Sequence, residues 1–351
     1  MRIAVTGATG NVGSALLREL GRADEVDEVV GIARRLPERT PPKVTWAPAD
    51  VRESDLRTLF TGVDAVVHLA WAIQPSRDRD ETASIDLEGT RRVLDAAGHA
   101  RVGTVVHASS IAVYSPTDDP HRRVDEEWPR GGVPSNFYSR DKVRAEELLD
   151  AFEHEHPDVR TVRLRPAPIA QRAAADELRR YFFGPFLPSA LIRPGRTPVA
   201  PMPLGLWFQI VHAEDVAAAY RLVLLDEEAR GAYNVAADPP IGPRRLAGLV
   251  GGVPLPIPGR RALRAVAALT WKARIQPTPP GWVDLAYGSP LLDTGRLRAL
   301  GWRPRHDGPE VVAELLAGLG EGATGDMPPL AGLGGRAQDV RTGVGADSGV
   351  G

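Results

Sequence analysis

The stretch MRIAVTGATGNVGS at residues 1–14 decides the fold, because a short apolar strand runs directly into a glycine-rich turn. Gly7 permits a tight strand-to-helix turn, Gly10 leaves room where a Cβ would meet a ligand, and Gly13 lets the next helix pack closely. That helix directs its N-terminal amides at any anion held in the turn. A glycine triplet alone is weak evidence, but a strand that feeds it directly predicts a dinucleotide-binding turn.

Apolar strands alternate with amphipathic helices through the first two thirds of the chain. Continuous apolar runs such as VVHLA at 66–70 are typical of strands covered on both faces. Helices are expected between the strands, for example at Ala83–Ala97 and Lys142–Glu153. The expected strands are Ile3–Thr6, Glu28–Ile32, Val44–Pro48, Ala65–Leu69, Thr104–Ala108, Thr161–Leu164, Phe208–Val211 and Ala232–Val235. This series predicts an α/β fold with a Rossmann-type, doubly wound parallel sheet.

The composition of the chain predicts two lobes and a tail. Residues 1–165 are expected to form the dinucleotide-binding Rossmann domain, to which residues 205–236 return. The proline-rich segments 166–204 and 237–319 are expected to form a smaller C-terminal α/β substrate lobe. Residues 320–351 contain mostly Gly, Ala, Asp and Arg, and we expect them to be a disordered tail.

The predicted substrate lobe has two expected helices and one aromatic cluster. The helices lie around Leu263–Trp271 and at Gly308–Leu319, where Pro309 suits a helix start. The aromatic cluster also contains leucines, and its part at 181–186 either lines an apolar substrate pocket or forms ordinary core. Its members are Tyr181, Phe182, Phe183, Phe186, Leu187, Leu191 and Trp207.

Charge and cysteine content exclude several classes of function. The formal net charge of −2 gives no basic footprint for nucleic acid. The chain has no cysteine, which rules out disulfides, thiolate nucleophiles and cysteine-ligated metals, and no other cluster has metal-ligand spacing. No apolar run approaches the ~20 residues that span a bilayer, and no signal peptide is evident. We expect a cytoplasmic protein with a small-molecule substrate and no nucleic-acid, membrane or metal partner.

A second motif, Tyr138-Ser-Arg-Asp-Lys142, supplies candidate chemistry, with Ser110 upstream in HASSIAVYS. The i, i+4 spacing places Tyr138 and Lys142 on one helix face. A phenol has an ordinary pKa of about 10, and a nearby ammonium and an oxidised nicotinamide both favour the phenolate. We therefore expect the pKa of Tyr138 to fall by ~3 units, which would make it a general acid or base toward a carbinol or carbonyl oxygen.

Several weaker motifs occur in a fixed order around these two. The stretches are TGATGNVGS at 6–14, DV at 50–51, VVHLAW at 66–71, SSIAVY at 109–114, LRPAPI at 164–169, IVHAEDVA at 210–217, YNVAAD at 233–238 and LDTGRLRALGWRPR at 292–305. Over roughly residues 1–315 the chain resembles the extended short-chain dehydrogenase/reductases, also called NAD-dependent epimerase/dehydratases. The resemblance implies a Rossmann-type enzyme and a homodimer built partly on the helix that bears Tyr138.

The resemblance also implies the roles of the catalytic residues. Ser110 would hydrogen bond the reacting oxygen, Tyr138 would transfer the proton, and Lys142 would hold the nicotinamide ribose. Ser109 is the alternative to Ser110. His68 and His107, on buried strands, are expected to be packed rather than catalytic.

Other matching positions are implied to bind the cofactor. The backbone of Asn11 and Val12 would contact the pyrophosphate. Asp50 would accept from the adenine amine, and the Val51 amide would contact the ring. The stretch Leu69, Ala70 and Trp71 would pass beside the adenosine ribose and phosphates. Two simpler interpretations stay open, in which Asp50 caps a helix and Leu69 belongs to the core. Asp215 in IVHAEDVA is expected to cap the next helix.

The end of the second expected strand, VVGIARR, bears on the choice of cofactor. Enzymes that use NAD usually place an acid there, whereas this chain has Ala33 followed by Arg34 and Arg35. Two guanidinium groups can grip a 2′-phosphate, so NADP(H) is favoured over NAD(H). The alternative is that both arginines are solvated loop residues.

Three departures from the family pattern narrow the activity. Ile111 and Ala112 replace the Asp-Glu pair of the dehydratases, which argues against water elimination. Arg165-Pro-Ala-Pro168 replaces the region where nucleotide-sugar epimerases carry an Asn, and Asp86 replaces another Asn near the cofactor. The sequence predicts an NAD(P)-dependent oxidoreductase that acts on a secondary alcohol or carbonyl. An NAD-dependent sugar epimerase and a non-catalytic NAD(P)-binding sensor or scaffold are the alternatives.

Overall fold

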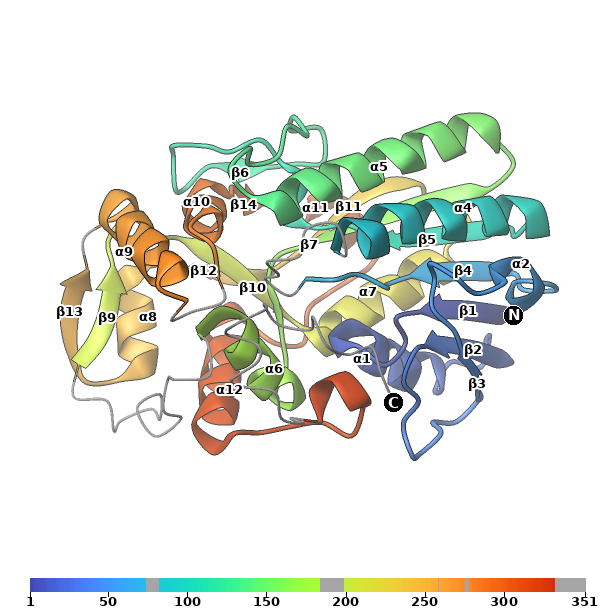
Figure 1. The fold of residues 1–351 in the computed structure, drawn as a ribbon, viewed down its shortest axis with the longest axis horizontal. Coiled ribbons are helices and arrows are strands. Elements are labelled where there is room, and N and C mark those ends of the chain that lie inside the picture. Colours follow the sequence, from blue (N-terminus) through green and yellow to red (C-terminus); the bar gives the residue numbers. More distant parts are fainter. Residues whose placement is uncertain (74–81, 184–198, 258, 275–277, 332–351) are drawn as a thin grey trace.

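The computed structural model describes residues 1–73, 82–183, 199–257, 259–274 and 278–331. Its largest sheet has seven parallel strands in the order β11-β7-β5-β4-β1-β2-β3 (Figure 1). The strands are β1 (Arg2–Thr6), β2 (Glu28–Ala33), β3 (Val44–Pro48), β4 (Ala65–His68), β5 (Thr104–Ala108), β7 (Arg160–Pro166) and β11 (Gly231–Val235). The order reverses between β1 and β4, so ligands are expected at the carboxyl ends of these two strands. The predicted Rossmann-type sheet is confirmed.

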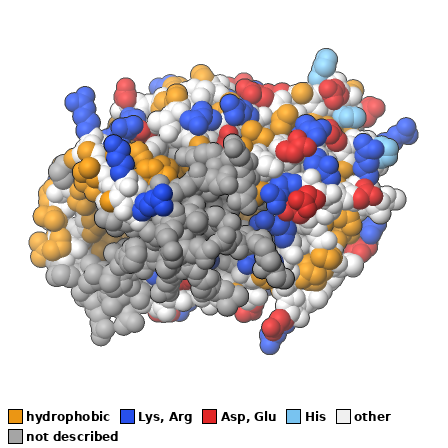
Figure 2. Space-filling model, viewed as in Figure 1, with side chains coloured by type: hydrophobic (Ala, Val, Ile, Leu, Met, Phe, Trp, Pro, Cys, Tyr) orange, Lys and Arg blue, Asp and Glu red, His pale blue; other side chains and the backbone are white. Residues whose placement is uncertain are grey.

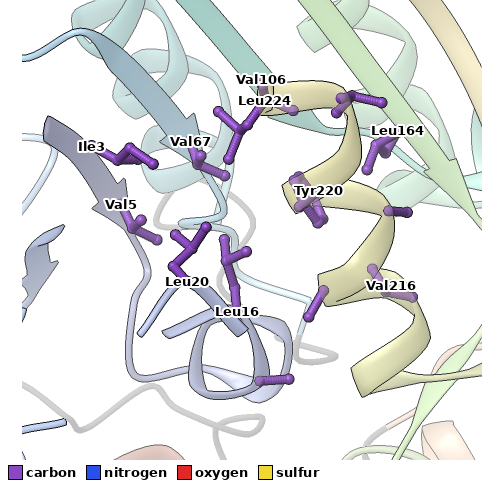
Figure 3. Close-up of a cluster of buried hydrophobic side chains, with 14 of the residues drawn as sticks. Ile3, Val5, Leu16, Leu20, Val67, Val106, Leu164, Val216, Tyr220 and Leu224 are labelled. Atoms are coloured by element: carbon purple, nitrogen blue, oxygen red, sulfur yellow. The ribbon is translucent and has the colours of Figure 1, made fainter. Parts of the chain in front are cut away.

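Helices cover both faces of this sheet. On one face lie α1 (Asn11–Leu20) and α7 (Ala213–Leu225), and on the other lie α2 (Leu56–Leu59), α4 (Gly89–Ala100) and α5 (Phe137–Glu155). Alternate strand residues point to opposite faces. Val5 therefore packs with α1 and α7 in one core cluster, as Figure 3 shows, while Ala4 belongs to a second cluster beneath α4 and α5. The Rossmann sheet is thus buried on both sides, as its apolar runs predict.

Two expected helices have other bounds. The helix expected at 83–97 is already helical at 82–83, passes through a π-helical turn, η1 (Ser84–Glu88), and continues as α4 to Ala100. Helix α5 begins at Phe137, five residues before Lys142, because the Asn136 side chain caps it by accepting from the Ser139 amide at 2.9 Å. Tyr138 consequently lies in the first turn of α5.

The expected strand at Phe208–Val211 exists but does not join the large sheet. It is β10 (Phe208–His212), which pairs with β8 (Ile169–Ala170) and β12 (Ala237–Ile241) in a three-stranded sheet. Two small parallel pairs accompany it. They are β9 (Val199–Pro203) with β13 (Val253–Ile257), and β6 (Arg123–Val124) with β14 (Leu291–Leu292). The domain boundaries drawn from composition stay a prediction.

The remaining helices surround these small sheets. They are α6 (Ala175–Leu178), α8 (Pro243–Val250), α9 (Arg260–Lys272), α10 (Gly281–Gly288), α11 (Gly295–Ala299) and α12 (Gly308–Glu321). Helix α12 has Pro309 in its first turn, as predicted, and begins with a capping box between Asp307 and Glu310. Among the described residues, no helix is both long and apolar enough to cross a membrane.

The expected disordered tail is wrong at its start. Helix α12 runs to Glu321, and a 3₁₀ turn at Pro328–Leu330 follows, in which Leu330 is buried because it packs back onto the molecule. Residues 332–351 lie outside the described residues. The same holds for Phe186, Leu187 and Leu191 of the aromatic cluster.

Candidate active site

The glycine-rich turn has the geometry that the sequence predicts. Gly7 has a φ of +68°, and a Cβ there would lie 2.6 Å from the Ala70 nitrogen. A Cβ on Gly13 would lie 2.5 Å from the Gly7 oxygen. For Gly10 the nearest atom, the Gly7 oxygen, is 3.3 Å away. The protein's own packing therefore requires Gly7 and Gly13, whereas the space beside Gly10 is available to a ligand.

Helix α1 begins immediately after this turn with an open N-terminus. No side chain caps the helix at Gly10, and its first turn holds no acid. Its first amides can therefore receive an anion such as a pyrophosphate. The Asn11 carbonyl accepts from the buried Gln171 side chain at 2.9 Å, and the Asn11 Oδ1 accepts from it at 2.8 Å. Val12 packs partly against the core. No motif in the sequence indicated that Gln171 fixes the start of α1.

The three predicted catalytic residues come together at the carboxyl end of β5. Tyr138 and Lys142 lie one turn apart on α5, and Ser110 follows β5, where its side chain is close enough to act on the pKa of the Tyr138 phenol as a hydrogen-bond partner. Ser139 ties the two elements together, because its hydroxyl donates to the Ala112 carbonyl at 2.6 Å. Ser139, which is not a candidate catalytic residue, thus holds α5 in place against the segment that carries Ser110.

Lys142 is buried beneath an indole ring. Its Nζ donates to the Ala108 carbonyl at 2.6 Å and lies 3.3 Å from the centre of the Trp71 ring. Burial lowers the pKa of Lys142 to about 7, although the carboxyl groups of Asp86 and Glu146 oppose the shift. The amine is therefore close to its titration midpoint at neutral pH.

Burial dominates the acidity of Tyr138. It raises the pKa of Tyr138 to about 12, the Ser110 hydrogen bond opposes that shift, and Asp86 adds to it. The expected fall in pKa is therefore wrong for the chain by itself, because desolvation dominates and the Lys142 Nζ lies as far as 5.8 Å from the phenol ring centre. The second cation of that expectation, the nicotinamide, belongs to the ligand.

The neighbouring Ser109 has a different partner. Its hydroxyl donates to the Glu146 carboxylate at 2.5 Å, and the Arg165 guanidinium donates to both oxygens of the same carboxylate at 2.9 and 2.7 Å. Burial alone would raise the pKa of Glu146, but the Arg165 hydrogen bond and charge outweigh it and lower that pKa to about 2. Ser109 thus belongs to a buried ion-pair network below the site, and the geometry favours Ser110 as the hydroxyl that acts with Tyr138.

Asp86 is a second acidic group beside the site. One oxygen of its buried carboxyl accepts from the Ala72 amide at 2.7 Å, and the other makes no hydrogen bond among the described residues. Burial raises the pKa of Asp86 well above its ordinary value. The sequence marked Asp86 as a departure from the family pattern, but it did not place this carboxyl near Lys142 and Tyr138.

Aromatic rings flank the Tyr138 phenol on two sides. Trp71 meets it edge-on with ring centres 6.3 Å apart, and Trp282 stacks on it at 5.4 Å with an interplanar angle of 26°. Trp282 comes from α10, which approaches so closely that a Cβ on Gly281 would lie 2.2 Å from the Ser135 carbonyl oxygen. The sequence analysis did not predict this contact; the small Gly281 next to the aromatic Trp282 is the feature of the sequence that could have indicated it.

Asp50 follows β3 and has its own cation. The Arg52 guanidinium donates to it at 3.1 and 2.9 Å, and although burial would raise the pKa of Asp50, these hydrogen bonds outweigh it and lower that pKa. Asp50 does not cap the next helix, α2, because Asp55 does so. Val51 is buried against Gly89, where a Cβ would lie 2.7 Å from the valine Cγ2. The ionised Asp50 is thus partnered within the chain.

The other predicted cofactor residues lie at the ends of β4 and β2. Leu69 packs partly against the core, in agreement with its simpler interpretation, and Ala70 adjoins the Gly7 turn. Arg34 and Arg35 are exposed directly after β2. The charge of Arg34 contributes to the lowered pKa of Asp50, which places this guanidinium near the start of the predicted adenosine region.

The two strand histidines are packed, as predicted. His68 lies between the hydroxyl groups of Thr6 and Thr90, at 2.7 and 3.0 Å. Burial, followed by the charge of Lys142, lowers the pKa of His68 to about 3. The pKa of the buried His107 is also well below its ordinary value for the same reasons. Both imidazoles are therefore neutral supports below the site.

The prediction that Asp215 caps the helix is wrong. The cap of α7 is His212, whose Nδ1 accepts from the Glu214 amide at 3.2 Å. Asp215 is instead buried, and its carboxylate accepts from the amides of Arg305 and His306 at 2.7 and 3.1 Å. These hydrogen bonds anchor the segment that leads into α12.

Because Asp215 holds this segment, His306 lies close to His212 and Glu214, from which it is about 90 residues away in the sequence. The potential metal-ligand atoms of His212, Glu214 and His306 lie within 4.8 Å of one another. However, the capping bond on Nδ1 leaves the His212 proton on Nε2, which faces Glu314 at 3.4 Å. An N–H cannot ligate a cation, so we interpret this group as a hydrogen-bonded helix cap.

Comparison with known proteins gives this arrangement a context. An uncharacterized protein of Mycobacterium tuberculosis is 28% identical over 318 residues, which is 90% of this chain and 30% of that protein. The chain thus spans less than a third of the length of this relative. The NAD-dependent glucose-6-phosphate dehydrogenase of Haloferax volcanii is 30% identical over 193 residues, 51% of this chain and 72% of that enzyme.

Two solved structures share the fold. The UDP-glucose 4-epimerase of Thermus thermophilus, solved with NAD, superimposes with a TM-score of 0.67 at 20% identity and covers 91% of this chain and 99% of its own. A dTDP-glucose 4,6-dehydratase of Streptomyces venezuelae, also with NAD, gives 0.66 at 20% identity, with coverage of 92% and 97%. The profile of the NAD dependent epimerase/dehydratase family matches residues 3–236. The chain belongs to this family of enzymes.

Proposed function

We propose that the protein is an NAD(P)-dependent oxidoreductase that transfers a hydride between a nicotinamide and a secondary alcohol or carbonyl carbon. The observation that carries this proposal is the meeting of Ser110, Tyr138 and Lys142 at one strand end, on the same sheet edge as the open N-terminus of α1. Tyr138 gives its proton to the substrate oxygen as hydride arrives, Ser110 orients that oxygen, and Lys142 holds the nicotinamide ribose. The nicotinamide, when bound, supplies the hydride.

The aromatic surroundings of Tyr138 support an apolar carbonyl substrate. Trp71 and Trp282 flank the phenol, and Phe137, Ile73 and Leu285 belong to the same apolar cluster. Such walls favour flat apolar groups and offer few partners to the hydroxyls of a sugar. Trp282→Ala should therefore lower kcat/KM for cyclic and aryl ketones about tenfold or more, with a small effect on the Kd for the cofactor.

The cofactor proposed is NADP(H). Relatives of this fold were solved with NAD, so the support comes from this chain alone, from Arg34 and Arg35 after β2 where no carboxylate stands. Titration with NADPH and NADH, followed by nicotinamide fluorescence, should show tighter binding of NADPH. Arg34→Ala should remove that preference. The control Arg22→Ala, at an exposed position after α1, should keep it. Equal affinity in the wild-type protein would overturn the NADP(H) assignment.

Two alternatives remain distinguishable from this proposal. A sugar epimerase would co-purify with tightly held NAD and would interconvert sugars without net consumption of cofactor. A sensor or scaffold would bind the cofactor and turn over no substrate, although all three candidate catalytic side chains are present. We expect the protein to be cytoplasmic and to form a homodimer. Sedimentation analysis of the purified protein tests the expected dimer.

A further inference from the structure

One end of the molecule exposes apolar side chains on neighbouring elements. Val253 and Leu255 of β13 are 69% and 55% exposed, and Val266 and Leu269 of α9 are 57% and 68% exposed. Figure 2 shows apolar side chains gathered at the end that carries β13 and α9, with Lys and Arg side chains beside them. Single exposed apolar residues are ordinary, but a group on two adjacent elements marks an interaction surface. We call these four residues the apolar end.

The same part of the sequence is strongly basic. Between Asp238 and Asp284 the chain contains seven basic residues and no acidic one, although the whole chain has a net charge of −2. The seven are Arg244, Arg245, Arg260, Arg261, Arg264, Lys272 and Arg274. Positive charge is thus concentrated in the segment that carries the apolar end, where Asp284 of α10 pairs with Arg260 and Arg264 and leaves Arg261 and Lys272 exposed.

Helix α9 exposes both apolar and basic side chains to solvent. None of its 13 residues is buried, unlike an ordinary surface helix whose apolar stripe faces the core. Val266 and Leu269 lie three residues apart on an exposed stripe, and Arg261 and Lys272, 11 residues apart, lie on the exposed stripe next to it. An exposed helix with adjacent apolar and cationic stripes is typical of helices that lie in a membrane interface.

The helix is also held firmly to the rest of the protein. Arg260 and Arg264 donate to the buried Asp284 of α10 at 3.1 and 2.9 Å. These two ion pairs fix the orientation of α9, so that its exposed stripes keep facing outward. Trp282, which stacks on Tyr138, lies on the same α10 helix.

We propose that the apolar end and the cations of α9 bind the surface of an anionic phospholipid bilayer. Apolar side chains would enter the boundary between headgroups and acyl chains, and Arg261 and Lys272 would meet the lipid phosphates. A second copy of this chain fits less well, because a twofold interface would place like cations against each other. Peripheral binding of this kind differs from the expectation of no membrane partner, which rested on the lack of a spanning segment, and the flotation experiment decides between the two. The proposal does not depend on the proposed activity.

Flotation of the full chain with lipid vesicles tests this inference. Vesicles of phosphatidylglycerol and phosphatidylcholine in equal amounts should bind the protein at least roughly tenfold more strongly than phosphatidylcholine alone, and high salt should weaken the binding. Leu269→Ser and the double variant Arg261→Glu/Lys272→Glu should each reduce binding about tenfold. The matched control Arg22→Glu/Arg57→Glu, at exposed positions of the Rossmann sheet's helices and turns, should bind as the wild type does.

Three results would overturn the inference. The first is no flotation with anionic vesicles, and the second is equal binding to both vesicle types. The third is a dimer in solution that Leu269→Ser dissociates, which would identify the apolar end as an interface between copies. Because the substituted side chains are exposed, circular dichroism of the variants should match that of the wild type, and a loss of binding then reports on the surface itself.

Discussion

At the scale of single residues, the environment of Tyr138 explains why chemistry depends on the ligand. Burial raises the pKa of Tyr138 to about 12, so the chain by itself holds the phenol protonated. A protonated phenol suits the reductive direction, in which it donates to a forming alkoxide. The oxidative direction needs the phenolate, which the positive charge of an oxidised nicotinamide favours when it is bound.

The role of the phenol as proton donor predicts the behaviour of Tyr138→Phe. The variant should lose about 10²–10⁴-fold in kcat, because only the proton-transfer group is removed. Its Kd for the cofactor should stay within a few fold of the wild-type value, since the ring and its contact with Trp282 remain. Tyr233→Phe, a buried tyrosine of β11 away from the site, serves as the control. Wild-type kcat in Tyr138→Phe would show that another group transfers the proton.

Lys142 predicts a conflict between activity and stability. Its folded pKa of about 7 lies below the ordinary value of 10.5, so between these values the unfolded chain binds more protons. The free energy of unfolding should therefore rise with pH through that window, and the cost of the buried amine is greatest below pH 7. Lys142→Met removes this cost.

We accordingly expect Lys142→Met to be inactive and yet more stable than the wild type at pH 6, by roughly 2–4 kcal/mol. The difference should shrink as the pH rises from 7 toward the ordinary lysine pKa of 10.5 and be smallest above it, where the amine is neutral in both states. Urea unfolding of the cofactor-free protein at both pH values measures it. A variant less stable at pH 6 would mean that the contacts with Ala108 and Trp71 outweigh desolvation.

At the scale of elements, two glycines of the same turn have different roles: Gly7 is needed for folding, and Gly10 is expected to be needed for cofactor binding. Gly7→Ala forces a left-handed backbone on alanine and places a Cβ 2.6 Å from the Ala70 nitrogen, so it should cost about 1–3 kcal/mol or more in unfolding free energy. Gly10→Ala has a negative φ and meets its nearest protein atom, the Gly7 carbonyl oxygen, at 3.3 Å, so a small shift relieves the contact and the variant should lose less stability than Gly7→Ala. It should nevertheless weaken cofactor binding, because the Cβ enters the ligand's space.

Thermal unfolding and cofactor titration of the two variants check this pair. Gly248→Ala, in a helix where an added Cβ meets nothing within 4 Å, is a control that should be neutral or slightly stabilising. If Gly10→Ala bound the cofactor with unchanged affinity, the pyrophosphate would lie elsewhere. If Gly7→Ala were as stable as Gly10→Ala, the turn would be less constrained than its geometry indicates.

How far the sequence predicted these elements depends on the range of the interactions. The strands of the large sheet and the Gly7 turn follow from local patterns, because apolar runs and glycine spacing act over a few residues. The placement of β10 in a second sheet, the stacking of Trp282 on Tyr138 and the hold of Gln171 on Asn11 come from distant segments. For the chain without its cofactor, the pKa of Tyr138 lies on the other side of its ordinary value from the prediction, since burial cannot be read from the i, i+4 spacing alone.

At the scale of the whole molecule, two regions have separate tasks. The Rossmann sheet brings Ser110, Tyr138 and Lys142 to the edge where a dinucleotide binds in this fold. The parts that follow β7 supply Trp282 as one wall of the site and, on the outer side of α9, a basic and apolar surface. We therefore expect the sheet to provide the chemistry and the segments after β7 to contribute to substrate selectivity.

The most direct test of the proposed activity is the stoichiometry of cofactor consumption with an apolar ketone. Wild-type protein with NADPH and a cyclic or aryl ketone should consume one NADPH for each alcohol formed. The account is contradicted if no ketone is reduced while sugar epimers interconvert on protein-bound NAD, with no net change in reduced nicotinamide.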